Sequence, residues 1–129
     1  MKGKEVLFSK KSDHWETPQE IKDLYKDYFD PCPLHHNIKE WDGLKIKWKS
    51  YTYVNPPYSN IRAWLEKAEE ELKEVNCLKI VFLVPARTDT KWFHEIAKNY
   101  EIRFIKGRLK FSNSKHSAPF PSMFIIMRK

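Results

Sequence analysis

The residues best suited to chemistry in this chain are Asn55, Pro56, Pro57 and Tyr58, which directly follow the β-prone run 51–54. Two prolines stiffen the loop and remove backbone donors, which leaves its carbonyl groups available as acceptors. A primary amine on a heteroaromatic ring donates two hydrogens, and the Asn55 side-chain oxygen and the Pro56 carbonyl can accept both. Tyr58 can stack on such a ring. We therefore predict that these four residues form a catalytic loop for an aromatic amine.

The chemistry of such an amine depends mainly on positioning. Its lone pair is conjugated into the ring, so it becomes nucleophilic when acceptors hold its hydrogens and favour a more tetrahedral nitrogen. Direct in-line transfer of a methyl group from a sulfonium then needs no covalent enzyme intermediate. The same four residues also fit a purely structural interpretation, a proline-rich turn closed by an aromatic side chain. A strand before the loop and a helix after it favour the chemical interpretation.

The elements around the loop predict an α/β domain. The segment 79–84 is nearly all apolar and ends at Pro85, which is typical of a strand covered on both faces. Apolar residues at helical spacing predict three helices: 18–28, with Thr17 as its cap, about 59–72, and 89–99. Shorter β-prone runs predict the remaining strands: 28–29, 44–48, 102–105, 108–111 and 123–127. The alternation predicts a largely parallel sheet with helices on both faces.

Composition limits the class of protein further. The 129 residues suffice for a single domain over 1–129, with 1–14 expected to form a flexible arm. Twenty-four Lys and Arg against 17 Asp and Glu give a formal charge of +7, which favours a polyanionic partner, although many basic proteins never bind nucleic acid. Cys32 and Cys77 form no metal or disulfide motif, and the five histidines have no metal-ligand spacing. Without a signal-peptide or membrane-spanning run, we expect a cytoplasmic protein with no membrane partner and no metal.

Several short sequence blocks, in order from about Trp15 to the C-terminus, correspond to those of a known family: 15–18, 29–32, 42–44 followed by Trp48, 55–59, 85–93, 107–111 and 118–122. With these blocks the chain resembles the phage-type DNA adenine-N6 methyltransferases, the Dam-like family of bacteriophages. The resemblance implies a compact Rossmann-like fold that binds S-adenosylmethionine. It also implies transfer of a methyl group to N6 of adenine in double-stranded DNA, with the target base flipped out, in a bacterial or phage-infected cell.

The resemblance implies roles for the matched residues. Asp30 would meet the amino acid or ribose of the donor, Trp15 and Thr17 would close over it, and Asp42 and Leu44 would line its adenine side. The full set expected to bind the cofactor is Trp15, Thr17, Asp30, Cys32, Asp42, Leu44 and Asn55. The chain departs from larger methyltransferases because it has only three glycines and no glycine-rich turn after a first strand. The segment 30–33 stands where that turn is expected. The part of the chain expected to bind the cofactor is therefore shorter than in larger methyltransferases.

Basic residues in the last matched blocks are expected to contact DNA phosphates beside the extruded base. These residues are Arg87, Lys91, Arg108 and Lys110. A solvated charged face would look the same in sequence. Other targets fit the same loop, namely cytosine N4, adenine in RNA or a protein glutamine. A catalytically inactive relative that binds DNA is an interpretation from a different class. Neither the recognition sequence nor the oligomeric state is predicted.

Overall fold

The computed structural model describes residues 14–33 and 42–129. Most of the predicted N-terminal arm lies outside these residues. At the centre is a four-stranded sheet with the strand order β1-β2-β4-β3. The strands are β1 (Tyr51–Val54), β2 (Lys79–Pro85), β3 (Glu101–Phe104) and β4 (Ser122–Arg128). The α/β class is therefore confirmed.

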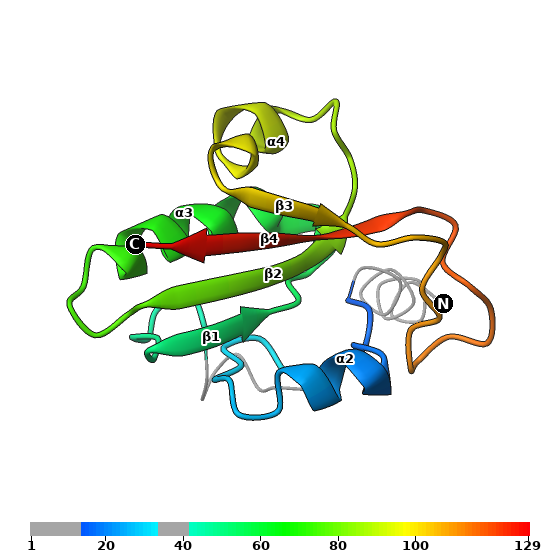
Figure 1. Ribbon diagram of the computed structural model, residues 1–129, viewed down its shortest axis with the longest axis horizontal. Coiled ribbons are helices and arrows are strands. Elements are labelled where there is room, and N and C mark those ends of the chain that lie inside the picture. Colours follow the sequence, from blue (N-terminus) through cyan, green and yellow to red (C-terminus); the bar gives the residue numbers. More distant parts are fainter. Residues whose placement is uncertain (1–13, 34–41) are drawn as a thin grey trace, which may run out of the picture.

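The direction of the strands differs from the prediction. β1 and β2 are parallel, whereas β4 runs antiparallel to both of its neighbours, β2 and β3. The sheet is thus mixed, and the expectation of a mostly parallel sheet was wrong (Figure 1). The physical reason lies in the connection 105–121. It contains no helix that carries the chain back to the other end of the sheet, so β4 must return in the opposite direction.

This topology gathers the matched sequence blocks at one end of the sheet. β1, β2 and β3 point the same way, and β4 begins where they end. The segment starting at Asn55, the segment starting at Ala86 and the connection 105–121 therefore all leave or join the sheet at this end. We call it the carboxyl end of the sheet. Ligands of open α/β sheets usually bind at such an end.

Helices cover both faces of the sheet. Alternate strand residues such as Val54 and Phe82 pack in one core with α3 (Ile61–Leu72) and with η2 (Ala97–Asn99), which follows α4 (Lys91–Glu95). Tyr53, Leu83 and their neighbours form a second core with the short helix α2 (Gln19–Leu24) and with Phe111 and Ala118 of the long connection. The prediction of helices on both faces is confirmed, although α2 and α4 are shorter than the predicted 18–28 and 89–99.

Three predicted strands are wrong. Residues 44–48 and 108–111 have no strand, and 28–29 contributes only a parallel bridge between Phe29 and Thr52. The backbone of these segments finds other partners. For example, Trp48 N donates to the Glu71 carboxylate, and Leu109 O accepts from Ala118 N. Alternation of apolar and polar residues therefore marked half-buried loops as well as strands.

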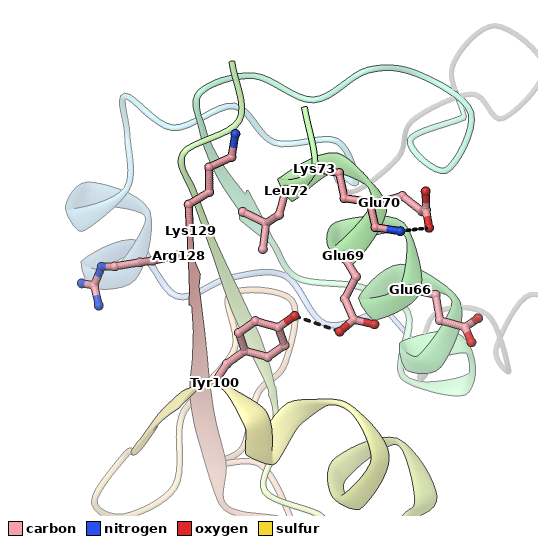
Figure 2. A pocket seen from close by; sticks show the side chains of 8 residues that line it. All are labelled: Glu66, Glu69, Glu70, Leu72, Lys73, Tyr100, Arg128 and Lys129. Carbon is pink, nitrogen blue, oxygen red and sulfur yellow. Dashed lines mark hydrogen bonds and ion pairs between the residues drawn. The ribbon is translucent and has the colours of Figure 1, made fainter. Parts of the chain in front are cut away.

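The opposite end of the sheet carries an open pocket of about 720 Å³ (Figure 2). Its lining comes from α3 and the residue after it, from Tyr100, and from Arg128 and Lys129 at the end of β4 and just beyond it. Tyr100 donates a hydrogen bond of 2.8 Å to Glu69 across it. Within 14–33 and 42–129, no group of three or more His, Cys, Asp or Glu side chains could hold a metal ion. In the same residues no helix has the length and apolar character to span a membrane.

Candidate active site

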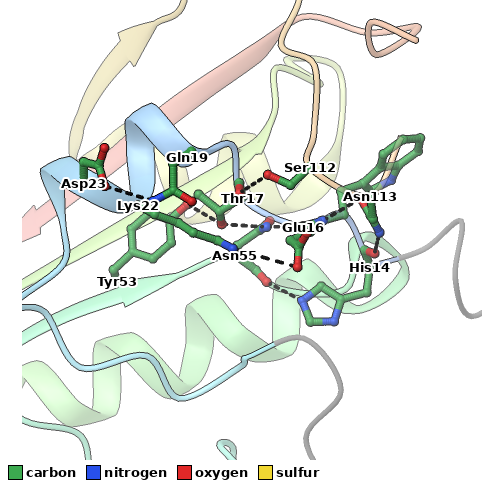
Figure 3. A network of polar contacts seen from close by, with 11 residues as sticks. His14, Glu16, Thr17, Gln19, Lys22, Asp23, Tyr53, Asn55, Ser112 and Asn113 are labelled. Atoms are coloured by element: carbon green, nitrogen blue, oxygen red, sulfur yellow. Dashed lines mark hydrogen bonds and ion pairs between the residues drawn. The ribbon is translucent and has the colours of Figure 1, made fainter. Parts of the chain in front are cut away.

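The Asn55 side chain is held in one orientation beneath the N-terminal segment 14–17 (Figure 3). Only 4% of this residue is exposed. Its Nδ2 donates to Thr17 Oγ1 at 3.1 Å and also to the backbone carbonyl of Trp15. Because a carbonyl can only accept, the atom that faces it must be the nitrogen. The amide is therefore turned so that Oδ1 points away from both partners.

Asn55 Oδ1 belongs to a small set of unsatisfied groups. Among the described residues, three buried side-chain polar atoms have no hydrogen-bond partner: Asn55 Oδ1, Tyr58 Oη and Ser122 Oγ. All three residues lie at the carboxyl end of the sheet, after β1 or at the start of β4. A buried polar group without a partner costs about 1–3 kcal/mol. Their concentration at one end points to a site that is completed by a ligand.

The loop 55–58, predicted to be catalytic, is covered rather than open. Pro56 is buried, and Tyr58, at the start of η1 (Tyr58–Asn60), is only 7% exposed. The Tyr58 ring contacts Phe120 at a centroid distance of 5.6 Å, and Phe120 contacts Trp15 at 5.5 Å. A base can therefore reach the Asn55 oxygen only if part of this cover moves. The loop pictured from the sequence alone, open and ready to bind a ring, is not the state of this structure.

Tyr58 keeps its phenol proton well into the alkaline range. Burial raises the pKa of Tyr58, and the positive charge of Arg87 opposes this rise. Arg87 thus lies close enough to act on the phenol, while its own side chain is exposed. The arrangement supplies a neutral aromatic ring beside a cation at the carboxyl end of the sheet.

The residues predicted to bind the cofactor form a second cluster beside the loop. Phe29 lies along β1, with hydrogen bonds to Tyr51 and Tyr53. The turn that follows is closed by Asp30 Oδ1, which accepts from Cys32 N at 2.8 Å. These contacts place the segment 30–33 next to the end of β1, where Asn55 begins the loop.

A second turn packs against the first. Asp42 Oδ1 accepts from Leu44 N at 3.0 Å. Between them, Gly43 approaches the Pro31 carbonyl so closely that a Cβ there would lie 2.0 Å from its oxygen, so only glycine fits. Burial is the main cause that raises the pKa of the Cys32 thiol, and the nearby charges of Asp30 and Asp42 add to it. The close packing of Gly43 on Pro31 thus places the turns that carry Asp30 and Asp42 side by side.

His14 joins this cluster to the catalytic loop, and sequence reasoning missed it. Its Nε2 lies 3.1 Å from the Asn55 carbonyl oxygen and 4.0 Å from Cys32 Sγ. Since the carbonyl can only accept, Nε2 carries the hydrogen and donates it. A single histidine in a polar, charged segment gives no signal of such a contact in the sequence.

The residues predicted to bind DNA are exposed at the same end of the sheet: Arg87, Lys91, Arg108 and Lys110. None of them forms an ion pair within the part of the chain that the structure describes. The pocket of Figure 2, at the other end, is lined by three carboxylates and three cations: Glu66, Glu69, Glu70, Lys73, Arg128 and Lys129. The four exposed cations predicted to bind DNA therefore lie at the same end of the sheet as Asn55, without an ion-pair partner among the described residues.

Fold and geometry together define an α/β protein with a candidate site at the carboxyl end of its sheet. The family model described as DNA N-6-adenine-methyltransferase (Dam) matches residues 5–129. The chain belongs to this family.

Two relatives come from bacteriophages. The chain is 30% identical over 125 residues to the DNA N-6-adenine-methyltransferase of Haemophilus phage HP1, a match that covers 83% of this chain and 72% of that protein. It is 31% identical over 112 residues to the DNA N-6-adenine-methyltransferase of Escherichia phage T1. That second match covers 75% of this chain and 46% of the T1 protein, so it spans about half of the longer relative. No solved structure matches the chain.

Proposed function

We propose that this chain transfers a methyl group from S-adenosylmethionine to N6 of adenine in DNA, using an abbreviated Rossmann-like methyltransferase fold. Family membership supports the reaction. The observation that carries the assignment of the site is Asn55 Oδ1, a buried acceptor without a partner among the described residues, in a proline-stiffened loop at the carboxyl end of the sheet. An exocyclic amine would donate the hydrogen bond that this oxygen lacks.

The loop acts by binding and orienting the amine. Asn55 Oδ1 and the Pro56 carbonyl would accept the two amine hydrogens and so turn the nitrogen lone pair toward the methyl group. As the nitrogen–carbon bond formed, the carbon–sulfur bond of the donor would break, the neutral thioether would leave, and the amine would lose one proton to water. Tyr58 stays neutral and stacks on the purine. The adenine must leave the duplex to reach the loop, because N6 is inaccessible to this chemistry inside the base stack. The aromatic cover formed by Trp15, Phe120 and Tyr58 must open for it.

The cluster beside the loop fits the proposed donor. When bound, S-adenosylmethionine supplies an electrophilic methyl group on a sulfonium. Its hydroxyl and ammonium groups need acceptors, and the carboxylates of Asp30 and Asp42 lie together near Cys32. Leu44 is half-buried beside them and offers an apolar contact. His14, which contacts Cys32 and Asn55, ties this cluster to the loop.

Charge supports double-stranded DNA as the partner. The exposed cations Arg87, Lys91, Arg108 and Lys110 surround the carboxyl end of the sheet. Contacts with phosphates there would hold the duplex over the loop. The bacterial or phage-infected cytoplasm, which contains both DNA and the donor, is the proposed place of action.

The experiment is incubation of the chain with DNA and S-adenosylmethionine labelled in the methyl group, followed by nucleoside analysis. We expect labelled N6-methyladenine. Label in N4-methylcytosine would overturn the choice of substrate, and so would label in RNA or protein offered in parallel incubations when the DNA stays unlabelled.

A second candidate is a DNA-binding relative without activity, and the burial of the catalytic loop favours it. Calorimetry with S-adenosylmethionine separates the two candidates. Binding of the donor together with methyl transfer supports the enzyme. DNA binding without any affinity for the donor supports the inactive relative.

A further inference from the structure

We infer that Thr17 is a positioning residue that orients the Asn55 amide so that its oxygen faces the target amine. This inference rests on the proposed function of Asn55. It assigns Thr17 a role different from the cofactor contact that the family resemblance implies.

The first observation is a chain of buried hydrogen bonds. The hydroxyl of Thr17 lies 3.1 Å from Asn55 Nδ2, which donates to it, and 3.0 Å from the Tyr53 hydroxyl. The three side chains are between 4% and 7% exposed. Water competes little at such positions, so each bond constrains the orientation of its partner. Tyr53 belongs to β1 and is fixed by the sheet, and the constraint on Asn55 therefore begins at a rigid element.

The second observation is that the Thr17 hydroxyl is not used where its sequence position would place it. A threonine before a proline and the start of a helix is expected to cap that helix. Here α2 begins at Gln19, its cap residue is Pro18, and no side chain caps it. The Thr17 hydroxyl turns instead toward Asn55 and Tyr53, and its backbone carbonyl accepts from Ser112 Oγ at 3.0 Å.

The two bonds from Asn55 Nδ2 decide which end of the amide is offered to a ligand. With Thr17 and the Trp15 carbonyl accepting both hydrogens, Oδ1 remains as the uncommitted atom. If the amide rotated by half a turn, Oδ1 would face the Trp15 carbonyl, and two acceptors would repel each other. The amide would then present an NH₂ group to the substrate amine, which cannot accept its hydrogens in a productive way. Removal of the Thr17 hydroxyl weakens the bias toward the productive orientation.

The test compares three variants in methyl transfer. Thr17→Val keeps the shape but removes the hydroxyl, Thr17→Ser keeps the hydroxyl, and Tyr53→Phe removes the anchor. We expect Thr17→Val to lower kcat about tenfold, the equivalent of one hydrogen bond, with KM for DNA changed less than about twofold. Thr17→Ser should restore kcat to near the wild-type value, and Tyr53→Phe should fall between the two. Wild-type kcat in Thr17→Val, or equal losses in Thr17→Val and Thr17→Ser, would overturn the inference.

Calorimetry distinguishes positioning from a cofactor contact. A positioning role leaves the affinity of Thr17→Val for S-adenosylmethionine unchanged. Weaker donor binding with unchanged kcat at saturating donor would show that Thr17 contacts the cofactor, and the inference would fail.

Nuclear magnetic resonance of the Asn55 side-chain amide provides a readout that needs neither donor nor DNA. The buried hydrogen bonds should slow hydrogen exchange of this NH₂ group, and Thr17→Val or, if that variant does not fold, Tyr53→Phe should speed it severalfold. If the wild-type chain transfers no methyl group, the proposed function fails, while the exchange rates still decide whether Thr17 holds Asn55. Fast exchange in the wild type would show that it does not.

Discussion

The imidazole Nε2 of His14 donates a hydrogen bond of 3.1 Å to the backbone carbonyl of Asn55, which connects segments 41 residues apart in the sequence. The same nitrogen lies 4.0 Å from Cys32 Sγ. The loop 55–58 and the turn that carries Asp30 therefore share one neighbour. Movement of either segment should displace the other, because hydrogen-bonded and packed polar groups of this kind seldom move independently.

Asn55→Ala should abolish methyl transfer, with a loss in kcat of about 100-fold or more, because the acceptor acts mainly as the reaction begins. The affinity for S-adenosylmethionine should stay within a few-fold of the wild type. Single-turnover transfer and calorimetry measure the two quantities. Asn60→Ala is the matched control, since Asn60 is exposed and forms no side-chain cap at the start of α3. Unchanged turnover in Asn55→Ala would remove Asn55 as the catalytic residue.

Asp30→Ala should weaken donor binding about tenfold or more, since a carboxylate bond to a charged group contributes about 1.5–3 kcal/mol. Asp30→Asn keeps an oxygen that can accept from Cys32 N, the bond that closes the turn, so it separates loss of charge from loss of structure. Calorimetry with S-adenosylmethionine gives both affinities. Asp27→Asn, an exposed change in the turn after α2, serves as the control. Equal donor affinity in the wild type and in Asp30→Ala would contradict the placement of the cofactor.

The sequence predicted the class of the fold but not the direction of strand β4 in its sheet. The apolar residues 80–84 are buried in β2 as expected, because both faces of this strand are covered. The direction of β4 depends on the path of the connection 105–121. Local patterns do not encode that path, because its backbone bonds reach distant partners such as Glu16 O, which accepts from Ser112 N at 3.0 Å.

The sequence predicted the local structure of the candidate site where its residues are adjacent, but not the contacts between distant residues. The loop 55–58 follows a strand, as its composition indicated. Thr17 looked like a helix cap, yet its hydroxyl contacts Tyr53, which is 36 residues away. The burial of the loop depends on Phe120, which is distant from Tyr58 in the sequence but contacts its ring. Contacts between distant segments of this kind leave no period or motif in a single sequence.

DNA affinity should depend on the exposed Arg and Lys side chains at the carboxyl end of the sheet. Each phosphate contact that is lost should reduce the slope of log affinity against log salt by about 0.9. We expect the double variant Arg87→Ala and Lys110→Ala to bind duplex DNA more weakly, with a slope reduced by about two such contacts. Fluorescence anisotropy over a range of salt concentrations measures this. Lys73→Ala, at the pocket of the opposite end, should leave both affinity and slope nearly unchanged. Equal effects of Lys73→Ala and of the double variant would rule out this DNA-binding face.

Alkaline pH should destabilise the fold. Burial raises the pKa of Cys32 above 9.0 and the pKa of Tyr53 and Tyr58 above 10.0, the ordinary values of these groups. Above those values the unfolded chain releases protons that the folded chain retains, so the free energy of unfolding falls as pH rises. Their contribution is fully present below about pH 9 and is lost progressively above it. Urea unfolding between about pH 8 and pH 11 measures the slope.

Tyr58→Phe tests directly whether the buried phenol contributes to the loss of stability at alkaline pH. The Tyr58 hydroxyl is buried without a partner among the described residues, so its removal should cost little stability near neutral pH and can even increase it. The decline of stability at alkaline pH should become shallower, because one of the groups that titrate only in the unfolded chain is gone. An unchanged decline would mean that the Tyr58 phenol ionises as readily in the folded chain as in the unfolded one.

The last prediction concerns Glu71, whose carboxylate is buried at 6% exposure although it lies on the acidic helix α3. It accepts from Trp48 N at 2.5 Å and from Lys67 Nζ at 3.1 Å. Trp48 Nε1 in turn donates to the Gly43 carbonyl at 2.7 Å, so Glu71 supports the turn that holds Asp42.

Glu71→Ala leaves the Trp48 donor buried and unpaired, and the free energy of unfolding should fall by about 1–3 kcal/mol. Glu71→Gln keeps one acceptor for Trp48 N and should lose less. The exposed neighbour provides the control: Glu70→Ala removes only a surface ion pair with Lys73 and should change stability by less than about 1 kcal/mol. Urea unfolding gives the three values. If donor affinity also falls in Glu71→Ala while the chain stays folded, the turn at Asp42 belongs to the cofactor site; a stability loss no larger than that of Glu70→Ala would show that the buried carboxylate does not hold it.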